Sequence, residues 1–284
     1  MTVLPWQART DAGRAFLDAV AKDPGGTLLA MDFDGTLAPI VDDPERSRMH
    51  EGAAAALAEL GRTLGKMAII TGRAVAAVRR LGNLDNRSGL ERLSILGQYG
   101  VERYDADTGM LRMPPQPDLN SLERELTGLI AGMGPCGDGV RLEHKGRAIG
   151  VHTRLASDPV RAFAMLEDPV KKIAAAHGLR VEPGRFVLEV RASTKSKADA
   201  LTELVSQFRP SRVAMIGDDL GDLPAFELLA ELRRAGLVCC AVLSGSSEAA
   251  DGLADVADVT CAGPDGVASW LGTLAARLAP PAAG

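Results

Sequence analysis

Residues 28–37 read Leu-Leu-Ala-Met-Asp-Phe-Asp-Gly-Thr-Leu. The apolar run that ends at Met31 follows Pro24-Gly25-Gly26 and predicts a short, buried strand of a parallel sheet. This strand delivers Asp32 and Asp34 to a glycine-containing turn at its carboxyl end, where ligands bind in open α/β sheets. Taken alone, the two carboxylates fit a metal site, an acid–base pair, a nucleophile with its helper, or an ordinary turn.

Strand and helix patterns alternate after this stretch. Further strands are predicted at 66–70, 94–102, 212–216 and 237–243, and helices at 51–64, 74–81, 197–208 and 222–235. The ends of the chain add a helix at 6–21, a short edge strand at 256–261 and a helix at 264–278. This alternation predicts an α/β fold with a doubly wound, mostly parallel sheet.

The middle of the chain follows a different pattern. A proline-rich run at 113–117 precedes a predicted helix at 118–133, strands at 140–144 and 148–154, a helical stretch at 158–177, and strands at 179–182 and 185–190. Pro169 should kink or split the second helix, and Lys145-Gly146 and Pro183-Gly184 should form turns. We therefore expect a core of residues 1–110 and 193–284, interrupted by an α+β domain of residues 111–192.

Composition excludes several classes of function. The 284 residues carry a net charge of −5 with both signs mixed, so no basic block suggests a nucleic-acid partner. No apolar run is long enough to span a bilayer, and the N-terminus lacks a signal-peptide pattern. The cysteines (Cys136, Cys239, Cys240 and Cys261) have no zinc-site or disulfide spacing, which favours a reduced, cytoplasmic setting.

Three predicted core strands end in polar side chains. These are Asp32 with Asp34, Thr71, and Asp218 with Asp219. Because the carboxyl ends of parallel strands meet at one edge of a sheet, we expect the side chains to lie together, with Lys197 at the start of a nearby helix. Clustered carboxylates suit Mg²⁺, whereas a hydroxyl and an ammonium group suit phosphate oxygens. Since an aspartate can also act as a covalent nucleophile, the pattern indicates magnesium-assisted phosphoryl transfer.

In chain order, these residues resemble the four motifs of the haloacid dehalogenase (HAD) superfamily. The motifs are Asp32-Phe-Asp-Gly-Thr36, Thr71, Lys197 and Gly217-Asp-Asp219. The resemblance covers nearly the whole chain, and residues 111–192 lie between the second and third motifs, where the superfamily places its larger α+β caps. It implies an HAD-like core with an inserted cap domain that determines substrate specificity.

The resemblance also implies a role for each motif residue. Asp32 would be the nucleophile that becomes phosphorylated, and Asp34 would protonate the leaving oxygen and then activate water. Thr71 and Lys197 would orient the phosphoryl group. The residues implied to hold Mg²⁺ are Asp32, Asp34 through its backbone carbonyl, Asp218, and either Asp219 or Asp222 in support.

Two neighbouring lysines compete for the third motif. The family pattern places Ser or Asn before the lysine and Ala three residues after it, and Ser196-Lys197-Ala198-Asp199-Ala200 keeps this register. Ala198 replaces the usual glycine. We therefore expect Lys197 to be the motif lysine and Lys195 to be a solvated surface charge.

Within the superfamily, the chain resembles the trehalose-6-phosphate phosphatase family. The matching segments are Asp32–Ile40, Thr71-Gly-Arg73, Gly100-Val-Glu102, Glu143-x-Lys145-Gly146, Val151-His-x-Arg154, Glu189-Val-Arg191 and Gly217-Asp-Asp-x-x-Asp222. The family's usual Thr and Glu in the last motif are Gly221 and Leu223 here, which puts a supporting contact in doubt but leaves the three acids in place.

The resemblance extends to residues that contact the sugar. Glu143, Lys145 and Glu189 are similar to the family's sugar-contacting residues, and His152 and Arg154 lie near them in the sequence. The alternative is that these are outward charges on half-exposed strands. Arg73 could cap its helix or contact substrate. Tyr99 is expected to be structural or exposed.

The family resemblance implies magnesium-dependent hydrolysis of trehalose 6-phosphate through an aspartyl phosphate, with a cap that closes over the sugar phosphate and a functional link to a trehalose-6-phosphate synthase. Two alternatives stay open. One is a phosphatase for another phosphorylated disaccharide, pseudo-disaccharide or sugar phosphate. The other is a non-catalytic sugar-phosphate sensor, against which the retention of both Asp32 and Asp34 argues.

Overall fold

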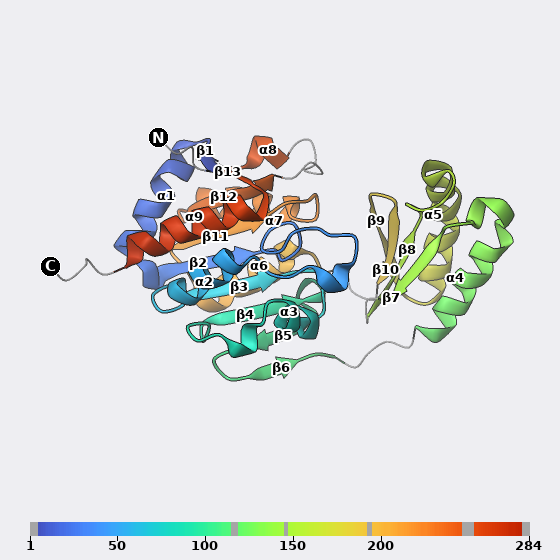
Figure 1. Ribbon diagram of the computed structural model, residues 1–284, viewed down its shortest axis with the longest axis horizontal. Helices are drawn as coiled ribbons and strands as arrows, with labels where there is room; N and C mark the ends of the chain where they lie inside the picture. The colour runs from blue at the N-terminus through green and yellow to red at the C-terminus, as the bar shows by residue number, and fades with distance from the viewer. Residues whose placement is uncertain (1–4, 115–118, 145–146, 192–194, 246–252, 280–284) are drawn as a thin grey trace. The chain divides into compact units, whose positions relative to one another are not determined.

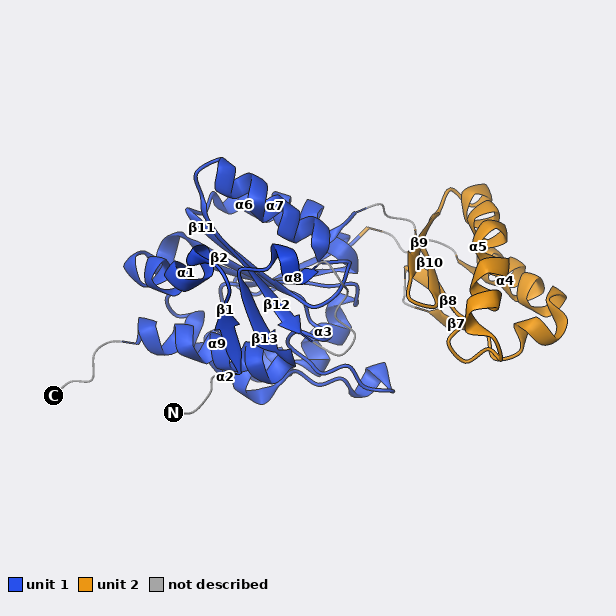
Figure 2. Ribbon diagram, turned by 90° about the horizontal axis from the view of Figure 1, so that it is seen from above, with its two compact units in different colours: residues 1–113, 195–284 blue, residues 114–194 orange. Residues whose placement is uncertain are grey.

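The structure is a computed structural model that describes residues 5–114, 119–144, 147–191, 195–245 and 253–279. The chain separates into two compact units, which we call unit 1 (residues 1–113 and 195–284) and unit 2 (residues 114–194) (Figure 2). No helix within the described ranges has both the length and the hydropathy needed to cross a membrane. The role of unit 2 as a specificity cap stays a prediction.

Unit 1 is built on a sheet that has nine strands among the described residues (Figure 1). In spatial order, these are β1 (Trp6–Ala8), β13 (Val259–Ala262), β12 (Val238–Gly245), β11 (Arg212–Gly217), β2 (Thr27–Met31), β3 (Lys66–Ile70), β4 (Leu93–Gly97), β5 (Glu102–Asp105) and β6 (Met110–Arg112). The strands from β13 to β4 pair in parallel, whereas β1, β5 and β6 pair antiparallel at the two edges. The predicted α/β fold with a mostly parallel sheet is therefore confirmed.

Helices cover both faces of this sheet. The first face carries α1 (Asp11–Lys22), α2 (Glu51–Leu60), α3 (Val75–Leu81) and α9 (Gly263–Leu278), and the second carries α6 (Lys197–Phe208), α7 (Leu223–Arg234) and α8 (Leu253–Val256). Every residue of β2 is buried between the two layers, which accounts for its largely apolar sequence.

The chain order reverses beside β2. The following strands β3 and β4 extend the sheet on one side of β2, and β11, β12 and β13 extend it on the other. In open α/β sheets, the crevice at the carboxyl ends of the strands around such a reversal is the usual ligand site. This topology brings the ends of β2, β3 and β11 side by side.

Unit 2 has, in its described residues, a four-stranded antiparallel sheet, two α-helices and a short 3-10 helix (Gly134–Gly137). The strand order is β7 (Arg141–His144), β8 (Ala148–His152), β10 (Val187–Arg191) and β9 (Arg180–Gly184), and the helices are α4 (Asn120–Gly132) and α5 (Pro159–Ala176). Apolar side chains such as Ile149 and Leu188 are buried with both helices. Because side chains alternate along a strand, Glu143, His152 and Glu189 occupy the opposite face of the sheet.

The N-terminal prediction was wrong in part. Residues 6–8 form β1, which pairs with β13, and α1 begins only at Asp11 because Thr10 caps it, accepting a hydrogen bond from the Gly13 amide at 3.1 Å. As a result β13 has a neighbour on each side and is not the expected edge strand. Three residues are too few to show a strand pattern in the sequence.

The predicted strand at 94–102, which the sequence showed as interrupted by glycines, was wrong in part. β4 ends at Gly97, and the chain reverses through Gln98, Tyr99 and Gly100 before β5 pairs antiparallel with β4. The φ angles of these three residues are 50°, 58° and 87°, so they occupy the left-handed region that interrupts a strand.

Two prolines of unit 2 lie within regular elements. α5 runs through Pro169 without being split, and Pro183-Gly184 belongs to β9, so that the hairpin turn falls on Arg185-Phe186. The amide that Pro169 lacks would have bonded to the carbonyl of Met165, whose exposed position leaves water as an alternative partner. The expected Lys145-Gly146 turn lies outside the described residues.

Candidate active site

A buried lysine joins three acids at the carboxyl ends of β2 and β11. The Lys197 ammonium group donates to Asp32 Oδ2 at 2.6 Å and to Asp222 Oδ1 at 2.7 Å, and lies 3.7 Å from Asp219 Oδ1. Lys197, Asp32 and Asp222 are buried, whereas the Asp219 side chain is 64% exposed. Sequence segments more than 150 residues apart therefore meet at one point.

The start of α6 directs Lys197 to this point. Ser196 caps the helix in a capping box with Asp199, which makes Lys197 the first helical residue. Lys195 lies before the cap, where its ammonium group donates to the Gly100 carbonyl at 3.1 Å and to Glu203 Oε2 at 3.4 Å. With 43% of its side chain exposed, Lys195 is a partly buried, hydrogen-bonded residue, so the prediction of a solvated surface charge was only partly right.

The loop after β11 is held by Asp222. Its Oδ2 accepts hydrogen bonds from the amides of Asp218 and Asp219 at 3.1 and 3.3 Å. The opposing turn comes very close, because a Cβ atom on Gly35 would lie 2.0 Å from Asp218 Oδ2, and Gly35 has a φ of 69°. Only glycine fits there. One carboxylate oxygen from each of Asp32, Asp218 and Asp222 lies within 4.8 Å of the others.

Burial makes this acid cluster electrostatically costly. Together with Asp219 and Asp222, it raises the pKa of Asp218 to about 8, and it raises the pKa of Asp222 to about 6 despite Lys197. Burial also raises the pKa of Asp32 well above its ordinary value. Burial alone would lower the pKa of Lys197, but Asp222, Asp32 and Asp219 raise it well above its usual value. The cluster therefore holds more negative charge than one lysine balances, and its oxygen-only donors fit a hard divalent cation.

Asp34 has a different partner. Arg73 binds its carboxylate with two nitrogens, Nε to Oδ2 at 2.6 Å and Nη2 to Oδ1 at 2.7 Å, and the Ser47 hydroxyl lies 3.3 Å from Oδ1. The Arg73 guanidinium also lies 5.8 Å from the centre of the Phe33 ring. Beyond the cap or substrate contact that the sequence suggested, Arg73 thus forms an ion pair with the predicted acid.

Thr71 lies at the end of β3 and is buried. Its amide donates to the Leu96 carbonyl at 3.1 Å, and its Oγ1 accepts from the Arg73 amide at 3.2 Å, which closes a tight turn over residues 71–73. The helix that follows has no side-chain cap of its own, and the Val75 amide donates instead to Glu102 Oε2 at 2.8 Å. Glu102 belongs to the Gly100-Val-Glu102 segment that resembles the family, and the sequence alone indicates no role for it.

Three hydroxyl groups near the site were missed. Thr36 Oγ1 lies 3.4 Å from Asp218 Oδ1, Ser244 donates to the Gly35 carbonyl at 2.6 Å, and Ser47 contacts Asp34. Thr36 belongs to the first motif, and Ser244 follows the apolar part of β12, so the sequence held a signal for both. Ser47 lies in a polar loop, and nothing in the sequence of that loop distinguishes it from its polar neighbours.

Unit 2 holds the other predicted binding residues. His152 Nε2 lies 2.7 Å from Glu143 Oε2, so these two side chains meet on the sheet. Glu189 is half-buried and is paired with Gly150 and Glu182 on the neighbouring strands. Arg154 is exposed beyond the end of β8, and Lys145 lies outside the described residues.

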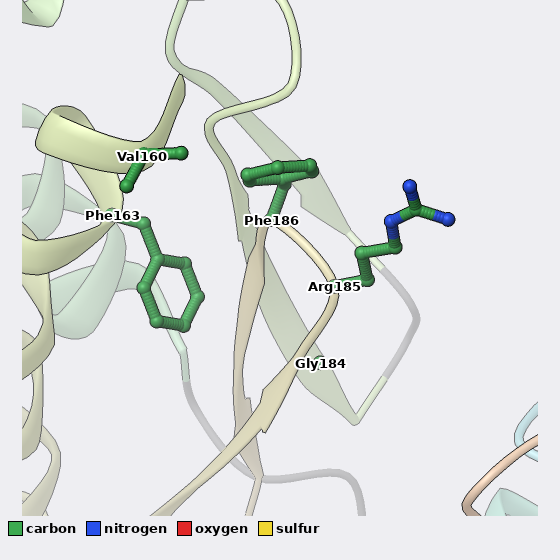
Figure 3. Close-up of a pocket in the computed structure, with 5 residues that line it drawn as sticks. All are labelled: Val160, Phe163, Gly184, Arg185 and Phe186. Atoms are coloured by element: carbon green, nitrogen blue, oxygen red, sulfur yellow. The ribbon is translucent and has the colours of Figure 1, made fainter. Parts of the chain in front are cut away.

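A hollow in unit 2 contains none of these residues. It is lined by Val160, Phe163, Gly184, Arg185 and Phe186 (Figure 3). The two phenyl rings and Val160 face the hollow, and the Arg185 side chain extends away from it. The residues that line this hollow include no acidic or nucleophilic side chain.

Comparison with known proteins identifies similar sequences and folds. The family model described as trehalose-phosphatase matches residues 30–256. A probable trehalose-phosphate phosphatase of Sinorhizobium fredii is 29% identical over 223 residues, which cover 78% of this chain and 80% of that protein. The trehalose-phosphate phosphatase of Mycobacterium leprae is 32% identical over 232 residues, but this match covers 78% of the present chain and only 51% of the relative.

A solved structure has the same fold. The C-terminal domain of Candida albicans trehalose-6-phosphate phosphatase matches with a TM-score of 0.73 at 20% identity, covering 95% of this chain and 98% of that domain. At this identity the likeness supports the fold alone.

Proposed function

The chain belongs to the trehalose-phosphatase family, and from this premise we propose that it hydrolyses trehalose 6-phosphate to trehalose and phosphate. One observation carries the proposal. A buried carboxylate, Asp32, is hydrogen-bonded to Lys197 at the carboxyl end of β2, and Asp34 follows two residues later at the same turn. A nucleophile and a separate acid at one sheet edge are what a two-step phosphoryl transfer requires.

In the first step, an Asp32 oxygen attacks phosphorus and the bond from phosphorus to the sugar oxygen breaks. Lys197 holds Asp32 Oδ2, and the Phe33 amide donates to Oδ1 at 2.6 Å, so both carboxylate oxygens are oriented before substrate arrives. When Arg73 exchanges its contact with Asp34 for a phosphoryl oxygen, the Asp34 carboxylate is free to bind a proton from solvent, and it gives this proton to the departing sugar oxygen. The products of this step are trehalose and a phosphorylated Asp32.

In the second step, Asp34 takes a proton from water while the water oxygen attacks the phosphorylated Asp32. The bond between phosphorus and the carboxylate oxygen breaks, which releases phosphate and restores Asp32. Thr71 and Lys197 orient the phosphoryl oxygens throughout. Arg73 holds Asp34 in place and can exchange this contact for a phosphoryl oxygen, since guanidinium binds both groups in the same way.

The acid cluster fits Mg²⁺ by the chemistry of its donors. Asp32, Asp218 and Asp222 offer three buried carboxylate oxygens within 4.8 Å of one another. We propose that Asp32, Asp218 and the Asp34 backbone carbonyl hold the ion, with Asp219 or Asp222 in support. When bound, the ion supplies positive charge that offsets the charge of the phosphoryl oxygens.

The polar face of the unit 2 sheet is the proposed sugar-binding surface. Glu189 lies directly opposite Glu182 in the antiparallel pair, and the Arg191 guanidinium forms an ion pair with the Glu182 carboxylate. Charged side chains gathered on one face of a sheet suit a ligand with several hydroxyl groups, and Glu143 and His152 adjoin on the same face. Lys145 and Arg154 complete the proposed set. In this role the protein would consume the product of a trehalose-6-phosphate synthase, in a cytoplasmic setting.

The proposal predicts that Asp32→Asn abolishes phosphate release from trehalose 6-phosphate and preserves the fold. The amide has almost the same shape but is not a nucleophile, so we expect a loss of at least about a thousandfold in kcat. Phosphate release with and without Mg²⁺ measures the activity, and circular dichroism checks the fold. Wild-type turnover by this variant would exclude the aspartyl-phosphate mechanism.

A substrate panel tests the assignment to trehalose. We expect trehalose 6-phosphate to give a higher kcat/KM than glucose 6-phosphate, sucrose 6-phosphate or a phosphorylated pseudo-disaccharide. A flat profile, or preference for a monosaccharide phosphate, would assign a different sugar phosphate to the same chemistry. Sugar-phosphate binding without phosphate release from any of them would indicate a sensor.

A further inference from the structure

The reversal between β4 and β5 holds the chain in an unfavourable backbone conformation. Gln98, Tyr99 and Gly100 have successive φ angles of 50°, 58° and 87°, and only the last is a glycine. A non-glycine residue in this region is strained, and such strain concentrates where surrounding contacts impose it for a functional reason. These contacts identify what the strained turn supports.

The backbone of this reversal is hydrogen-bonded to the turn after β3. The Gln98 amide donates to the Arg73 carbonyl at 2.9 Å, and the Tyr99 amide donates to the Thr71 carbonyl at 2.9 Å. Thr71 is the residue proposed to orient the phosphoryl group, and Arg73 binds Asp34. The left-handed conformation thus presents two successive amides to the two ends of the 71–73 turn.

The Tyr99 side chain covers the middle of the same turn. A Cβ atom on Gly72 would lie 2.8 Å from the Tyr99 hydroxyl oxygen, 3.0 Å from Cζ and 3.4 Å from Cε2. The phenol therefore occupies the space that a side chain at position 72 would need. Tyr99 is half-buried, so its ring forms part of the wall beside this turn.

The opposite side of the reversal contacts the elements that carry Lys197. The Gly100 carbonyl accepts a hydrogen bond from Lys195, two residues before Lys197, at 3.1 Å. A Cβ atom on Gly100 would lie 3.2 Å from the Cβ of Ala200, in the first turn of α6. The strained segment is therefore packed between the turn that holds Thr71 and the helix that begins at Lys197.

We propose that Tyr99 is a positioning residue that holds the 71–73 turn in the shape that binds the phosphoryl group. Its amide fixes the Thr71 carbonyl, and its ring fixes Gly72 from the side. The inference rests on the proposed phosphatase function and adds to it a residue that acts through Thr71 and Arg73. Because the phosphoryl group is common to all candidate substrates, the effect of Tyr99 does not depend on the sugar.

The first test compares substitutions of the two tyrosines in the chain. Tyr99→Leu should raise KM for every accepted sugar phosphate, and the inhibition constant of inorganic phosphate, by about tenfold. Tyr99→Phe keeps the ring and should stay within about twofold of wild type. Tyr104→Leu is the matched control, since Tyr104 packs under Arg79 at 4.3 Å from the guanidinium carbon, and it should leave both constants unchanged.

A merely structural role would give a different result. Tyr99→Leu would then reduce the fraction of active enzyme, which lowers kcat and leaves KM and the phosphate inhibition constant as in wild type, and this outcome overturns the proposal. A change in preference between sugars would overturn it as well. If the wild-type protein releases phosphate from none of the sugar phosphates, the proposed function is wrong, but the role of Tyr99 is still open to test. The next experiment tests that role through phosphate binding and needs no turnover.

The second test observes phosphate binding directly. Protein labelled with 3-fluorotyrosine should give two ¹⁹F resonances, which Tyr104→Phe assigns. Inorganic phosphate with Mg²⁺ should shift the Tyr99 resonance and leave the Tyr104 resonance in place. In addition, Gly72→Ala should weaken phosphate binding in wild type but not in Tyr99→Leu, because the added methyl group collides with the phenol. An unmoved Tyr99 resonance, or additive effects of the two substitutions, would overturn the proposal.

Discussion

At the scale of single residues, Lys197 and Lys195 show how two positions decide the role of the same side chain. Lys197 follows the helix cap and is 4% exposed between Asp32 and Asp222, whereas Lys195 precedes the cap and is 43% exposed. Removing one partner of a buried ion pair leaves uncompensated charge and costs about 3–5 kcal/mol, whereas a partly exposed pair contributes about 0–1 kcal/mol.

We therefore predict that Lys197→Ala loses at least about a hundredfold in kcat/KM and that Lys195→Ala loses less than about threefold. Phosphate release measures the activity, and the thermal midpoint shows whether each variant is folded. Lys197→Arg tests whether the positive charge alone supports activity, because it keeps the charge while the larger guanidinium does not fit the same two acceptors. Activity that depends on Lys195 and not on Lys197 would show that the motif was aligned two residues out of register.

The sequence could identify most of the chemical groups but not all of their partners. Asp32, Thr71, Lys197 and Asp218 were found because each follows a strand or starts a helix, and strand ends can be located from apolar runs. The ion pair between Arg73 and Asp34 joins positions 39 residues apart, and its geometry depends on side-chain conformations that no local pattern encodes. The same reason explains why Ser47 was missed.

At the scale of elements, α3 depends on a residue outside itself. Ala74 offers no side-chain cap, and the buried Glu102 of β5 accepts the Val75 amide instead. Glu102 also brings a negative charge to the helix N-terminus, which the helix dipole favours. Because α3 directly follows the 71–73 turn, this contact links the helix to the candidate site.

We predict that Glu102→Ala lowers the free energy of unfolding by about 1–2 kcal/mol, because it leaves a buried amide without its acceptor. Glu102→Gln keeps an acceptor oxygen and should lose less. Urea denaturation followed by circular dichroism measures both values, and Glu227→Ala, at an exposed site on α7, is the control. Equal stability of wild type and Glu102→Ala would mean that α3 needs no cap from β5.

Elements were easiest to predict where burial alone determines them. β2, β3 and β11 are almost entirely buried, and their apolar runs identified all three. β1 and β6 have three residues each and depend on pairing with a neighbouring strand, which a local pattern cannot show. In α5 the local pattern is misleading in the opposite direction, because Pro169 suggests a break where the helix continues. Buried residues on both sides of Pro169, including Leu166 and Val170, outweigh the unfavourable proline.

At the scale of the whole molecule, the two units divide the proposed tasks. The residues of the phosphoryl chemistry belong to unit 1, and the described residues of the proposed sugar-binding surface belong to unit 2. Each unit has its own apolar core. Substitutions on the polar face of unit 2 can therefore change sugar preference without disturbing the acid cluster.

The acid cluster also makes the stability of the whole protein depend on pH and metal. The pKa values of Asp218, about 8, and Asp222, about 6, and the raised pKa of Asp32 all exceed the ordinary value of 3.8 that applies after unfolding. Between pH 4 and 8 the folded state thus binds more protons than the unfolded state, so these groups lose their stabilising contribution as pH rises. The raised pKa of Lys197 keeps it charged throughout this range.

For metal-free protein in EDTA, we therefore predict that the acid cluster lowers the thermal midpoint as pH rises from 5 to 7.5. Mg²⁺ should raise the midpoint more at pH 7.5 than at pH 5, because a cation compensates ionised carboxylates and competes with protons for protonated ones. Asp218→Asn should reduce both the pH dependence and the response to Mg²⁺, whereas Asp11→Asn, at a 99% exposed carboxylate, should change neither. Scanning calorimetry at the two pH values measures these shifts. An equal Mg²⁺ response at both pH values would mean that the ion does not bind at the acid cluster.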